Sequence, residues 1–323
     1  MTESAPMTRL LILLAMPEKV RARYSDRLKL VFPQITVDSV DHHGKVDPYI
    51  GDADVLLTFA PMLAPRVIAA AKNLKWIQAL GSGVDGIADH PALRRETIVT
   101  RIHGIHEAAV SESVIASMLA LARDLPRAVR NQDKHVWERW PSRLLDRKTA
   151  AVYGVGSIAM GLAPRLKALG MRVIGVSSKP HEIAGFERVY GRGELEAAAR
   201  ECDFLVILTP TTPKTQHTVN AKVLAAMKPS AYLVNAAHGG VVDEDALLHA
   251  LGGGRLAGAA MDVFAKEPLP ADHPFWAARN FLLTPHLGGF YDEYPDRALP
   301  VVEENMRRFL AGDFAHMVYR VEH

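Results

Sequence analysis

The sequence has few of the features that mark disulfide-rich, zinc-binding, nucleic-acid-binding or membrane proteins. Its single cysteine, Cys202, excludes an internal disulfide, and no cysteine–histidine spacing typical of a zinc site occurs. The 38 lysines and arginines nearly balance the 36 aspartates and glutamates, and no basic run is dense enough to indicate a nucleic-acid partner. The apolar run at residues 10–16 is too short to cross a membrane. We therefore expect no metal site, no nucleic-acid partner and no membrane partner.

The first residues also lack the pattern of a secretory leader. Residues 1–8 contain Glu3 and no basic start, and no small-residue cleavage site follows the apolar run. This pattern favours a cytoplasmic location. Cys202 opens the apolar stretch 202–208, so we expect its side chain to be a small buried hydrophobic group.

The length of 323 residues exceeds what one hydrophobic core usually supports, so two domains are expected. Hydrophobic residues make up 49% of the chain and charged residues 23%, which is the composition of an ordinary globular protein. No low-complexity segment and no internal repeat is visible in the sequence.

Short apolar segments alternate with helical ones along the whole chain. Residues 9–15, 55–59 and 74–79 are predicted strands, and 65–72 is a predicted helix. Strands separated by helices indicate a parallel sheet covered on both faces, whose ligands bind at the carboxyl ends of the strands. A second series of predicted strands covers residues 149–153, 171–176, 204–208, 231–235, 256–261 and 281–284.

A long helix is predicted from Glu107 to Arg123. Apolar residues recur there at steps of three or four, and further apolar residues widen the stripe. Such a wide stripe is typical of a helix buried between domains or between subunits. The stripe contains Val110, Val114, Ile115, Met118, Leu119, Leu121 and Ala122.

The best local motif follows the first strand of the second series. Gly154 permits a tight turn, Gly156 lets the backbone approach a pyrophosphate, and Ala159 takes the third glycine's place in helix–sheet packing. The helix would begin at Ser157 and Ile158, with the phosphates at its amino end. A lone match of this kind also occurs without a nucleotide, so a non-nucleotide role stays open.

The end of the next strand indicates which dinucleotide fits. A carboxylate at this place would bind the adenosine ribose and repel a 2′-phosphate, but the sequence has Ser177, Ser178 and Lys179. Two hydroxyls and a cation suit a phosphate monoester and favour NADP(H), with NAD(H) as the alternative. A solvated turn without any ligand is the other interpretation.

Two side chains at strand ends suggest proton-transfer chemistry. His286 follows an apolar strand, and the two glycines after it leave space beside its ring. A histidine in such a position can exchange a proton near neutral pH. Glu267 follows the preceding strand, and a carboxylate close to His286 would stabilise its protonated form. Taken singly, His286, one of 14 histidines in the chain, is better explained as a satisfied surface histidine, and Glu267 as an exposed loop glutamate, the commonest place for that residue type.

The first segment has its own glycine-rich turn at residues 81–86. Free backbone N–H groups in such a turn form a nest that binds a carboxylate. An ordinary turn without a ligand is the alternative.

In this order, these pieces resemble the family of D-isomer-specific 2-hydroxyacid dehydrogenases, which includes glyoxylate and hydroxypyruvate reductases. The likeness runs from about Val55 to Gly312. The motifs that carry it are residues 81–85 (GSGVD), 110–112 (VSE), 154–156 (GVG), 208–215 (LTPTTPKT), 235–247 (NAAHGGVVDEDAL), 262–264 (DVF), 267–270 (EPLP) and 284–289 (TPHLGG).

The resemblance implies two doubly wound parallel-sheet domains, the central one a Rossmann dinucleotide-binding domain. It implies a substrate domain built from residues 1–104 plus 288–323, a dinucleotide-binding domain at 105–287, and a cleft between them. It also implies a homodimer, with the long helix supporting the interface.

The same resemblance implies roles for individual residues. His286 would be the acid/base, Glu267 its partner, and the amides near Ser82 and Gly83 would hold the substrate carboxylate. Asp262 would approach the nicotinamide carboxamide. The residues expected to bind the cofactor are Gly154, Gly156, Ser157, Ile158, Ser177, Ser178, Lys179, Thr209, Pro210, Thr215, Ala236, Asp262 and Gly288.

One position departs from the family pattern. His238 stands where the family carries an arginine that binds the substrate carboxylate and carbonyl, and a histidine cannot form the same two-pronged contact. We keep His238 as a catalytic candidate. Arg101, His103 and His106, on the loop entering the long helix, are candidates for the missing charge, with Arg101 expected to bind the substrate.

The sequence therefore predicts an NAD(P)-dependent oxidoreductase that reduces a small 2-oxo acid to a 2-hydroxy acid. NADPH would supply the hydride and His286 the proton. The alternative is a protein that senses a dinucleotide with little or no turnover, because the expected arginine is missing at His238. A dehydrogenase for a different acid or for a ketone without a carboxylate is the third interpretation.

Overall fold

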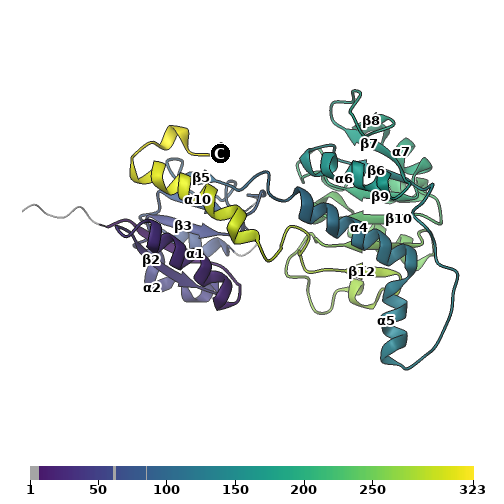
Figure 1. The fold of residues 1–323 in the computed structure, drawn as a ribbon, viewed down its shortest axis with the longest axis horizontal. Coiled ribbons are helices and arrows are strands. Elements are labelled where there is room, and N and C mark those ends of the chain that lie inside the picture. The colour runs from purple at the N-terminus through teal and green to yellow at the C-terminus, as the bar shows by residue number, and fades with distance from the viewer. Residues whose placement is uncertain (1–6, 61–62, 85) are drawn as a thin grey trace, which may run out of the picture. The chain divides into compact units, whose positions relative to one another are not determined.

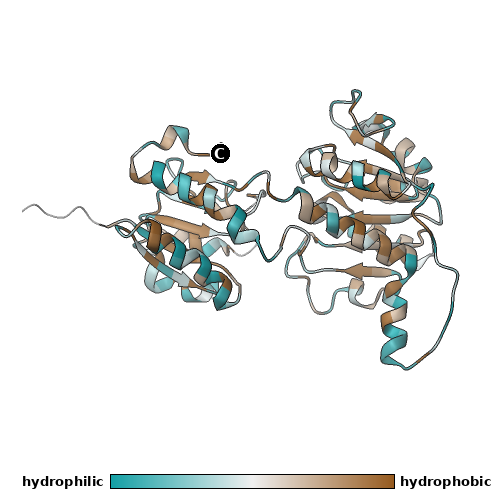
Figure 2. Ribbon diagram, viewed as in Figure 1, coloured by the Kyte–Doolittle hydropathy of each residue, from teal (hydrophilic) through white to brown (hydrophobic). Residues whose placement is uncertain are grey.

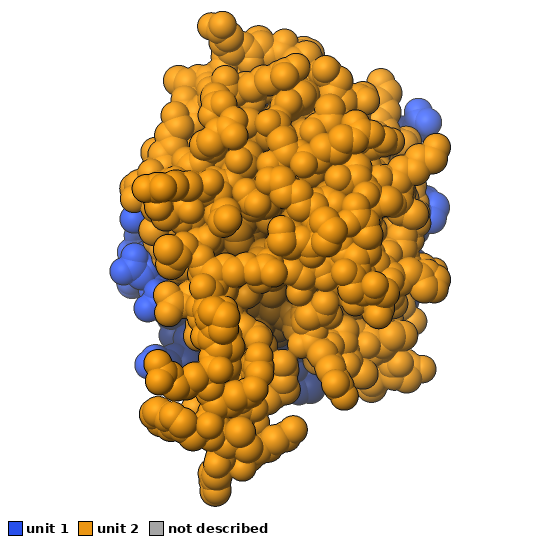
Figure 3. Space-filling model, turned by 90° about the vertical axis from the view of Figure 1, so that its right-hand side faces the viewer, with its two compact units in different colours: residues 1–105, 292–323 blue, residues 106–291 orange. Residues whose placement is uncertain are grey.

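The computed structural model describes residues 7–60, 63–84 and 86–323, and the chain divides into two compact units (Figure 3). Unit 1 contains Met1–Ile105 and Asp292–His323, and unit 2 contains His106–Tyr291. Each is α/β with a mainly parallel sheet, so the predicted fold class is confirmed. Asp85 of the 81–86 turn, and residues 1–6 of the segment tested for a leader, lie outside the described residues.

In the described residues of unit 1, the sheet has six strands in the order β13-β5-β4-β3-β1-β2, and β13 alone is antiparallel to its neighbour. Its central strands are buried along nearly their whole length, as expected for a parallel sheet covered on both faces. The strands are β1 (Arg9–Leu13), β2 (Thr36–Val40), β3 (Val55–Thr58), β4 (Trp76–Ala79), β5 (Ile98–Thr100) and β13 (Arg320–Val321).

Helices from both ends of the chain cover this sheet. α1 (Glu18–Val31) and α10 (Tyr294–Leu310) pack against each other and appear in purple and yellow in Figure 1. Arg27 Nε and Glu303 Oε1 lie 2.6 Å apart across this helix pair. The other helices of unit 1 are α2 (Asp47–Ile50) and α3 (Pro65–Ala70).

The sheet of unit 2 has seven parallel strands in the order β12-β11-β10-β9-β6-β7-β8. The chain runs outward in one direction from β6 and then in the other direction from β9, so the β6–β9 boundary is the switch point where such sheets bind ligands. The strands are β6 (Thr149–Tyr153), β7 (Arg172–Ser177), β8 (Val189–Gly191), β9 (Phe204–Ile207), β10 (Tyr232–Asn235), β11 (Gly258–Met261) and β12 (Phe281–Leu283).

The long helix α4 (Glu107–Arg123) has the predicted bounds and packs on α6 and the sheet. Its stripe is not uniformly buried: Val114 and Met118 are inaccessible, whereas Leu119 is 39% exposed. α4 therefore has one face in the core and apolar groups on another. The other helices of unit 2 are α5 (Leu125–Asp133), α6 (Ser157–Ala168), α7 (Leu195–Glu201), α8 (Ala221–Ala226) and α9 (Glu244–Gly252).

Four strands lie outside the predicted set. β2 carries polar residues at the sheet edge, and β5, β8 and β13 have only two or three residues, too few for a periodic signal. Their neighbours in the sheet, rather than their own composition, make them strands. The predicted strands all exist, but most of them begin or end one or two residues inside the predicted bounds.

Apolar strands form the centre of each unit and polar residues lie on the outer helices (Figure 2). Cys202 is fully buried, as expected, and burial raises the pKa of its thiol to about 12. No helix in the described ranges combines the length and the apolar character that crossing a bilayer needs.

Candidate active site

The carboxyl ends of the unit 2 strands bring the predicted proton-transfer residues together. His286 follows β12 and Glu267 follows β11, and these strands are parallel neighbours. His286 Nδ1 lies 2.7 Å from Glu267 Oε2, while Phe264 N–H donates to Glu267 Oε1 at 2.9 Å. The His286 side chain is 48% exposed and that of Glu267 is 21% exposed. A backbone N–H thus fixes the Glu267 carboxylate, and about half of the His286 side chain stays accessible.

The pairing of His286 with Glu267 shifts the pKa values of both side chains. The hydrogen bond to Glu267, together with the charges of Glu267 and Asp262, raises the pKa of His286 against the opposing effect of burial. Burial alone would raise the pKa of Glu267, but the hydrogen bond and charge of His286 outweigh it and lower that pKa. The pair therefore favours a carboxylate beside a protonated imidazole, which is the form that can donate a proton.

Asp262 fixes the loop that carries His286. Its Oδ1 accepts from Thr284 Oγ1 at 2.5 Å and from Leu287 N–H at 2.8 Å, and its Oδ2 accepts from Gly288 N–H at 2.7 Å. His286 has a left-handed backbone (φ 55°), and its N–H donates to Asp262 O at 2.8 Å. A non-glycine residue keeps this conformation only where its surroundings enforce it. Asp262 is thus a positioning residue for the imidazole. Thr284, which sequence reasoning missed, supports it from the strand end.

A close backbone approach joins the His238 loop to the Glu267 loop. A Cβ at Gly239 would lie 1.9 Å from Phe264 C, so only glycine fits there. Asn235 Nδ2 donates to His238 O at 3.0 Å and so fixes the turn. Phe264 is also the residue whose N–H donates to Glu267 Oε1. The structure therefore packs the loop that carries His238 against the segment that holds Glu267 and, through it, His286.

The predicted cofactor turn has the geometry that a pyrophosphate needs. Gly154 has φ 104°, and a Cβ there would lie 2.6 Å from the backbone of Leu208 and Thr209. At Gly156 nothing lies within 4 Å of an added Cβ, so the turn is open on that side. α6 begins at Ser157 without a side-chain cap, which leaves its first N–H groups available to an anion. The residues therefore fit a dinucleotide.

The loop after β9 contributes surface and support. Thr209 is buried and Pro210 is exposed at the switch point, and half-buried Ala236 follows the next strand. Thr215 is buried inside the loop, where its hydroxyl donates to Pro210 O at 2.7 Å and accepts from Thr212 N–H at 2.7 Å. Thr215 therefore shapes the cofactor loop from within.

At the end of β7, Ser177 is half-buried while Ser178 and Lys179 are exposed. Lys179 N–H donates to Ser177 Oγ at 3.2 Å, which folds the turn back on the strand end. Gly288 is buried against Asp262, where an added Cβ would meet Oδ2 at 2.8 Å.

Unit 1, taken by itself, places Arg101 beside the Ser82–Gly83 turn, where the sequence predicts a carboxylate site. Arg101 Nη1 donates to Ser82 O at 3.2 Å, so the guanidinium lies at the 81–86 turn. In the part of the chain that the structure describes, neither the Ser82 N–H nor the Gly83 N–H donates a hydrogen bond. A carboxylate at this turn would meet free amides and a cation. Of the other two candidates, His103 packs against Tyr319 in unit 1, and His106 lies beside Gly289 in unit 2.

Comparison with known proteins agrees with this geometry. The family described as D-isomer specific 2-hydroxyacid dehydrogenase, NAD binding domain, matches residues 115–288. A D-3-phosphoglycerate dehydrogenase from Methanocaldococcus jannaschii is 35% identical over 273 residues, which cover 83% of this chain and 52% of that protein. The chain thus spans about half the length of this protein and of two further D-3-phosphoglycerate dehydrogenases that it resembles.

Two solved structures extend the likeness over nearly the whole chain. A D-isomer specific 2-hydroxyacid dehydrogenase family protein from Aeromonas salmonicida is 32% identical, with a TM-score of 0.84 and coverage of 98% of this chain and 99% of that one. An NADPH-dependent glyoxylate/hydroxypyruvate reductase from Sinorhizobium meliloti, solved with NADP and sulfate, is 28% identical, with a TM-score of 0.80 and 98% coverage of both chains. This chain belongs to the D-isomer specific 2-hydroxyacid dehydrogenase family.

Proposed function

We propose that this protein reduces a small 2-oxo acid to the 2-hydroxy acid with NADPH, and that His286 supplies the proton. The observation that carries the proposal is the hydrogen-bonded His286–Glu267 pair at the edge of the sheet that also bears the open glycine turn. When bound, the nicotinamide supplies a hydride to the carbonyl carbon. As the carbonyl π bond breaks, the oxygen takes the proton from His286 Nε2, and Glu267 stabilises the imidazolium before transfer.

Asp262 maintains the geometry of this step without exchanging a proton. Its carboxylate accepts three hydrogen bonds from the 284–288 loop and so keeps the imidazole in one orientation. Orientation of this kind lowers the barrier because the donor need not be ordered during the reaction. The resemblance also assigns Asp262 to the nicotinamide carboxamide, and we retain that assignment as part of the proposal.

We assign the substrate carboxylate to the Ser82–Gly83 amides with Arg101, and the carbonyl oxygen to His238. The free amides and the nearby guanidinium of unit 1 support the first assignment. The close approach of the His238 loop to the segment that holds Glu267 supports the second. A protonated histidine polarises a carbonyl as a single donor, where an arginine would offer two.

NADP(H) is the preferred cofactor in this proposal. The end of β7 carries Ser177, Ser178 and Lys179 and no carboxylate, which suits a 2′-phosphate. The Sinorhizobium relative was solved with NADP, which is consistent with this preference. Charge-assisted bonds of this kind contribute about 1–3 kcal/mol, or about 5- to 150-fold in affinity.

The second candidate is a dinucleotide sensor without turnover, and His238 is the observation that favours it. The glycine turn and the β7 end would still bind the cofactor in such a protein. Only His238, in the place of the expected arginine, would fail to bind the substrate carbonyl well enough for turnover. The two functions differ in one result, because both bind NADPH but only the enzyme oxidises it.

The test is an NADPH-oxidation screen over glyoxylate, hydroxypyruvate, pyruvate, phenylpyruvate and branched 2-oxo acids, with NADP⁺-dependent oxidation of 3-phosphoglycerate as a further arm. We expect turnover with at least one 2-oxo acid, and turnover that is about 10²- to 10⁴-fold lower in His286→Ala. Fluorescence titration of NADPH and NADH measures the cofactor preference. NADPH binding without any turnover supports the sensor. Equal or tighter NADH binding contradicts the cofactor preference.

A homodimer completes the proposal. α4 and α5 leave apolar side chains exposed, with Leu119 at 39%, Leu125 at 50% and Val129 at 58%. Water contact with several apolar groups on neighbouring helices is unfavourable and is relieved by a second copy. The 2-oxo acid and the second copy are the partners that we propose.

A further inference from the structure

The outer strand of the unit 2 sheet places one more cation at the β7 edge. β8 pairs in parallel with β7, and the register sets Gly191 opposite Ser177. Neighbouring strands lie about 4.8 Å apart, so Arg192, the next residue, comes level with Ser178 at the same edge. The loop after β7 also returns over this point, since a Cβ at Gly191 would contact Pro180 Cγ at 3.8 Å.

Arg192 differs from Arg172 and Arg200 because its guanidinium has no ion-pair partner among the described residues. Its Nε is buried and has no hydrogen-bond partner, and no ion pair among the described residues involves it. By contrast, Arg172 pairs with Glu187, and Arg200 pairs with Glu196. The carboxylate nearest in sequence, Glu194, accepts instead from Gly191 N–H at 2.8 Å.

An unpaired buried donor on a cation is costly, so its persistence calls for a ligand. A buried polar group without a partner loses the full free energy of its hydration, and the loss is larger for charged groups. An anion that contacts the guanidinium gives the cation the charge partner that the described residues do not provide. The groups nearest along the two strands are hydroxyls and a second cation, in Ser177, Ser178 and Lys179, while the carboxylate of Glu182 lies further along the exposed loop.

We infer that Arg192 completes an anion site with Ser178 and Lys179, and that its ligand is a phosphate monoester such as the 2′-phosphate of NADP(H). This inference rests on the cofactor preference proposed above. A guanidinium forms two parallel hydrogen bonds to phosphate oxygens, which serine hydroxyls and an exposed lysine do not reproduce. A free ribose hydroxyl gives the guanidinium no charge partner. Arg192 therefore discriminates NADP(H) from NAD(H).

The experiment measures binding of the adenosine fragments rather than activity. Calorimetric titration with 2′,5′-ADP and with 5′-AMP compares the native protein with Arg192→Gln. We expect the native protein to bind 2′,5′-ADP more tightly and Arg192→Gln to lose about 10- to 100-fold for 2′,5′-ADP only. NADPH affinity should fall in parallel while NADH affinity stays within about twofold.

Two further variants make the result specific. Arg200→Gln removes an exposed arginine on α7 that pairs with Glu196 across one helical turn, and it should leave both affinities unchanged. Arg192→Lys keeps the charge but not the two-pronged contact, so it should give an intermediate loss. It also keeps the test decisive if Arg192→Gln proves unstable on heating.

The outcomes separate the two proposals. If the native protein binds both fragments equally, the NADP(H) preference is wrong and the role of Arg192 fails with it. If the native protein discriminates and the ratio survives in both Arg192 variants, the preference stands and the assignment of Arg192 alone is overturned.

Discussion

At the residue scale, the proton held by His286 depends on one carboxylate. Glu267 raises the pKa of His286, so the imidazole stays protonated to a higher pH than a free histidine would. Reduction needs the protonated form, and activity is therefore present below that raised pKa and is lost as pH rises through it.

Glu267→Gln should move this loss of activity to lower pH, because the histidine loses the charge of its hydrogen-bonded partner and only the charge of Asp262 still opposes the lowering effect of burial on its pKa. His286→Ala should reduce kcat by about 10²- to 10⁴-fold with little change in NADPH affinity. The measurement is kcat against pH for the native protein and both variants. A profile of Glu267→Gln that coincides with the native one would remove the carboxylate from the mechanism.

His238 gives the second prediction at this scale. A histidine that stands in for arginine loses its charge near neutrality, whereas arginine stays charged. KM for the substrate should therefore rise as pH climbs through about 6 to 8. His238→Arg should flatten that rise and lower KM for simple 2-oxo acids.

KM against pH for the native protein and His238→Arg, measured with the best substrate of the screen, decides the question. Asn235 and Gly239 keep the loop against Phe264 in both proteins, so the comparison changes only the side chain. Parallel curves for the two proteins would mean that other groups hold the substrate. The same conclusion would follow if His238→Arg abolished reduction while His238→Ala retained it.

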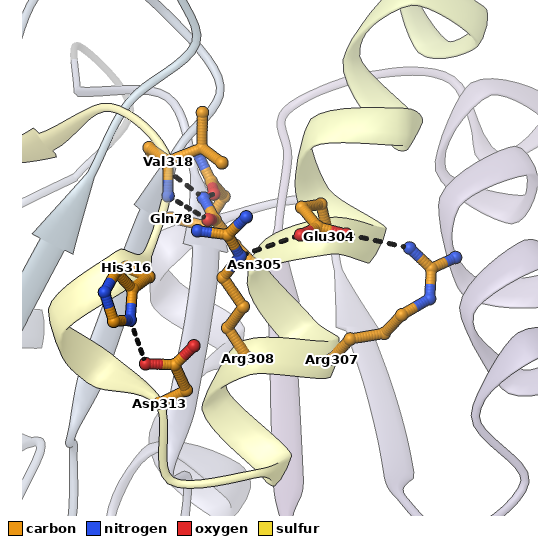
Figure 4. A network of polar contacts seen from close by, with 8 residues as sticks. All are labelled: Gln78, Glu304, Asn305, Arg307, Arg308, Asp313, His316 and Val318. Carbon is orange, nitrogen blue, oxygen red and sulfur yellow. Dashed lines mark hydrogen bonds and ion pairs between the residues drawn. The ribbon is translucent and has the colours of Figure 1, made fainter.

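At the element scale, a buried amide joins the C-terminal helix to the unit 1 sheet (Figure 4). Asn305 of α10 is inaccessible; its Nδ2 donates to Gln78 Oε1 at 3.0 Å, and its Oδ1 accepts from Val318 N–H at 2.6 Å. Thr100 donates to the same Gln78 oxygen at 2.8 Å. One side chain thus connects α10, β4 and the segment that leads into β13.

Asn305→Ala should lower the free energy of unfolding by about 1–3 kcal/mol, because it leaves the partly buried Val318 N–H and the buried Gln78 side chain without their partner. Glu304→Gln is the matched control, since the neighbouring Glu304 forms only ion pairs with Arg307 and Arg308 whose side chains are 30–53% exposed. Such pairs contribute about 0–1 kcal/mol. Urea denaturation of the three proteins measures the difference. Equal losses in both variants would contradict a special role for the amide.

At the scale of the whole molecule, the exposed apolar side chains of α4 and α5 predict the oligomeric state. Light scattering should give about twice the chain mass of 35.4 kDa. Val129→Glu should shift the mass toward the monomer, because a buried unpaired carboxylate destabilises an interface. Leu30→Glu, on α1 of unit 1 and 75% exposed, is the control that should leave the mass unchanged. A monomeric native protein would contradict the proposed dimer.

The sequence by itself determined the local features of this protein. Periodic apolar stretches predicted the central strands and the bounds of α4, because burial on one face or two imposes a repeat that is visible residue by residue. Gly154 and Gly156 indicated the cofactor turn because the required backbone geometry excludes side chains. Family motifs placed His286 and Glu267 in one site before any distance was known.

Tertiary structure decided whatever depends on residues far apart in the chain. β2, β5, β8 and β13 are strands because neighbouring strands pair with them, which a segment that is very short or rich in polar residues does not reveal on its own. Thr215, predicted to line the cofactor, proves to be buried within its own loop. The position of Arg101 at the Ser82 turn and the unpaired Nε of Arg192 follow from strand register and packing. Charge and hydrogen bonding act between groups close in space, and only the fold establishes which groups those are.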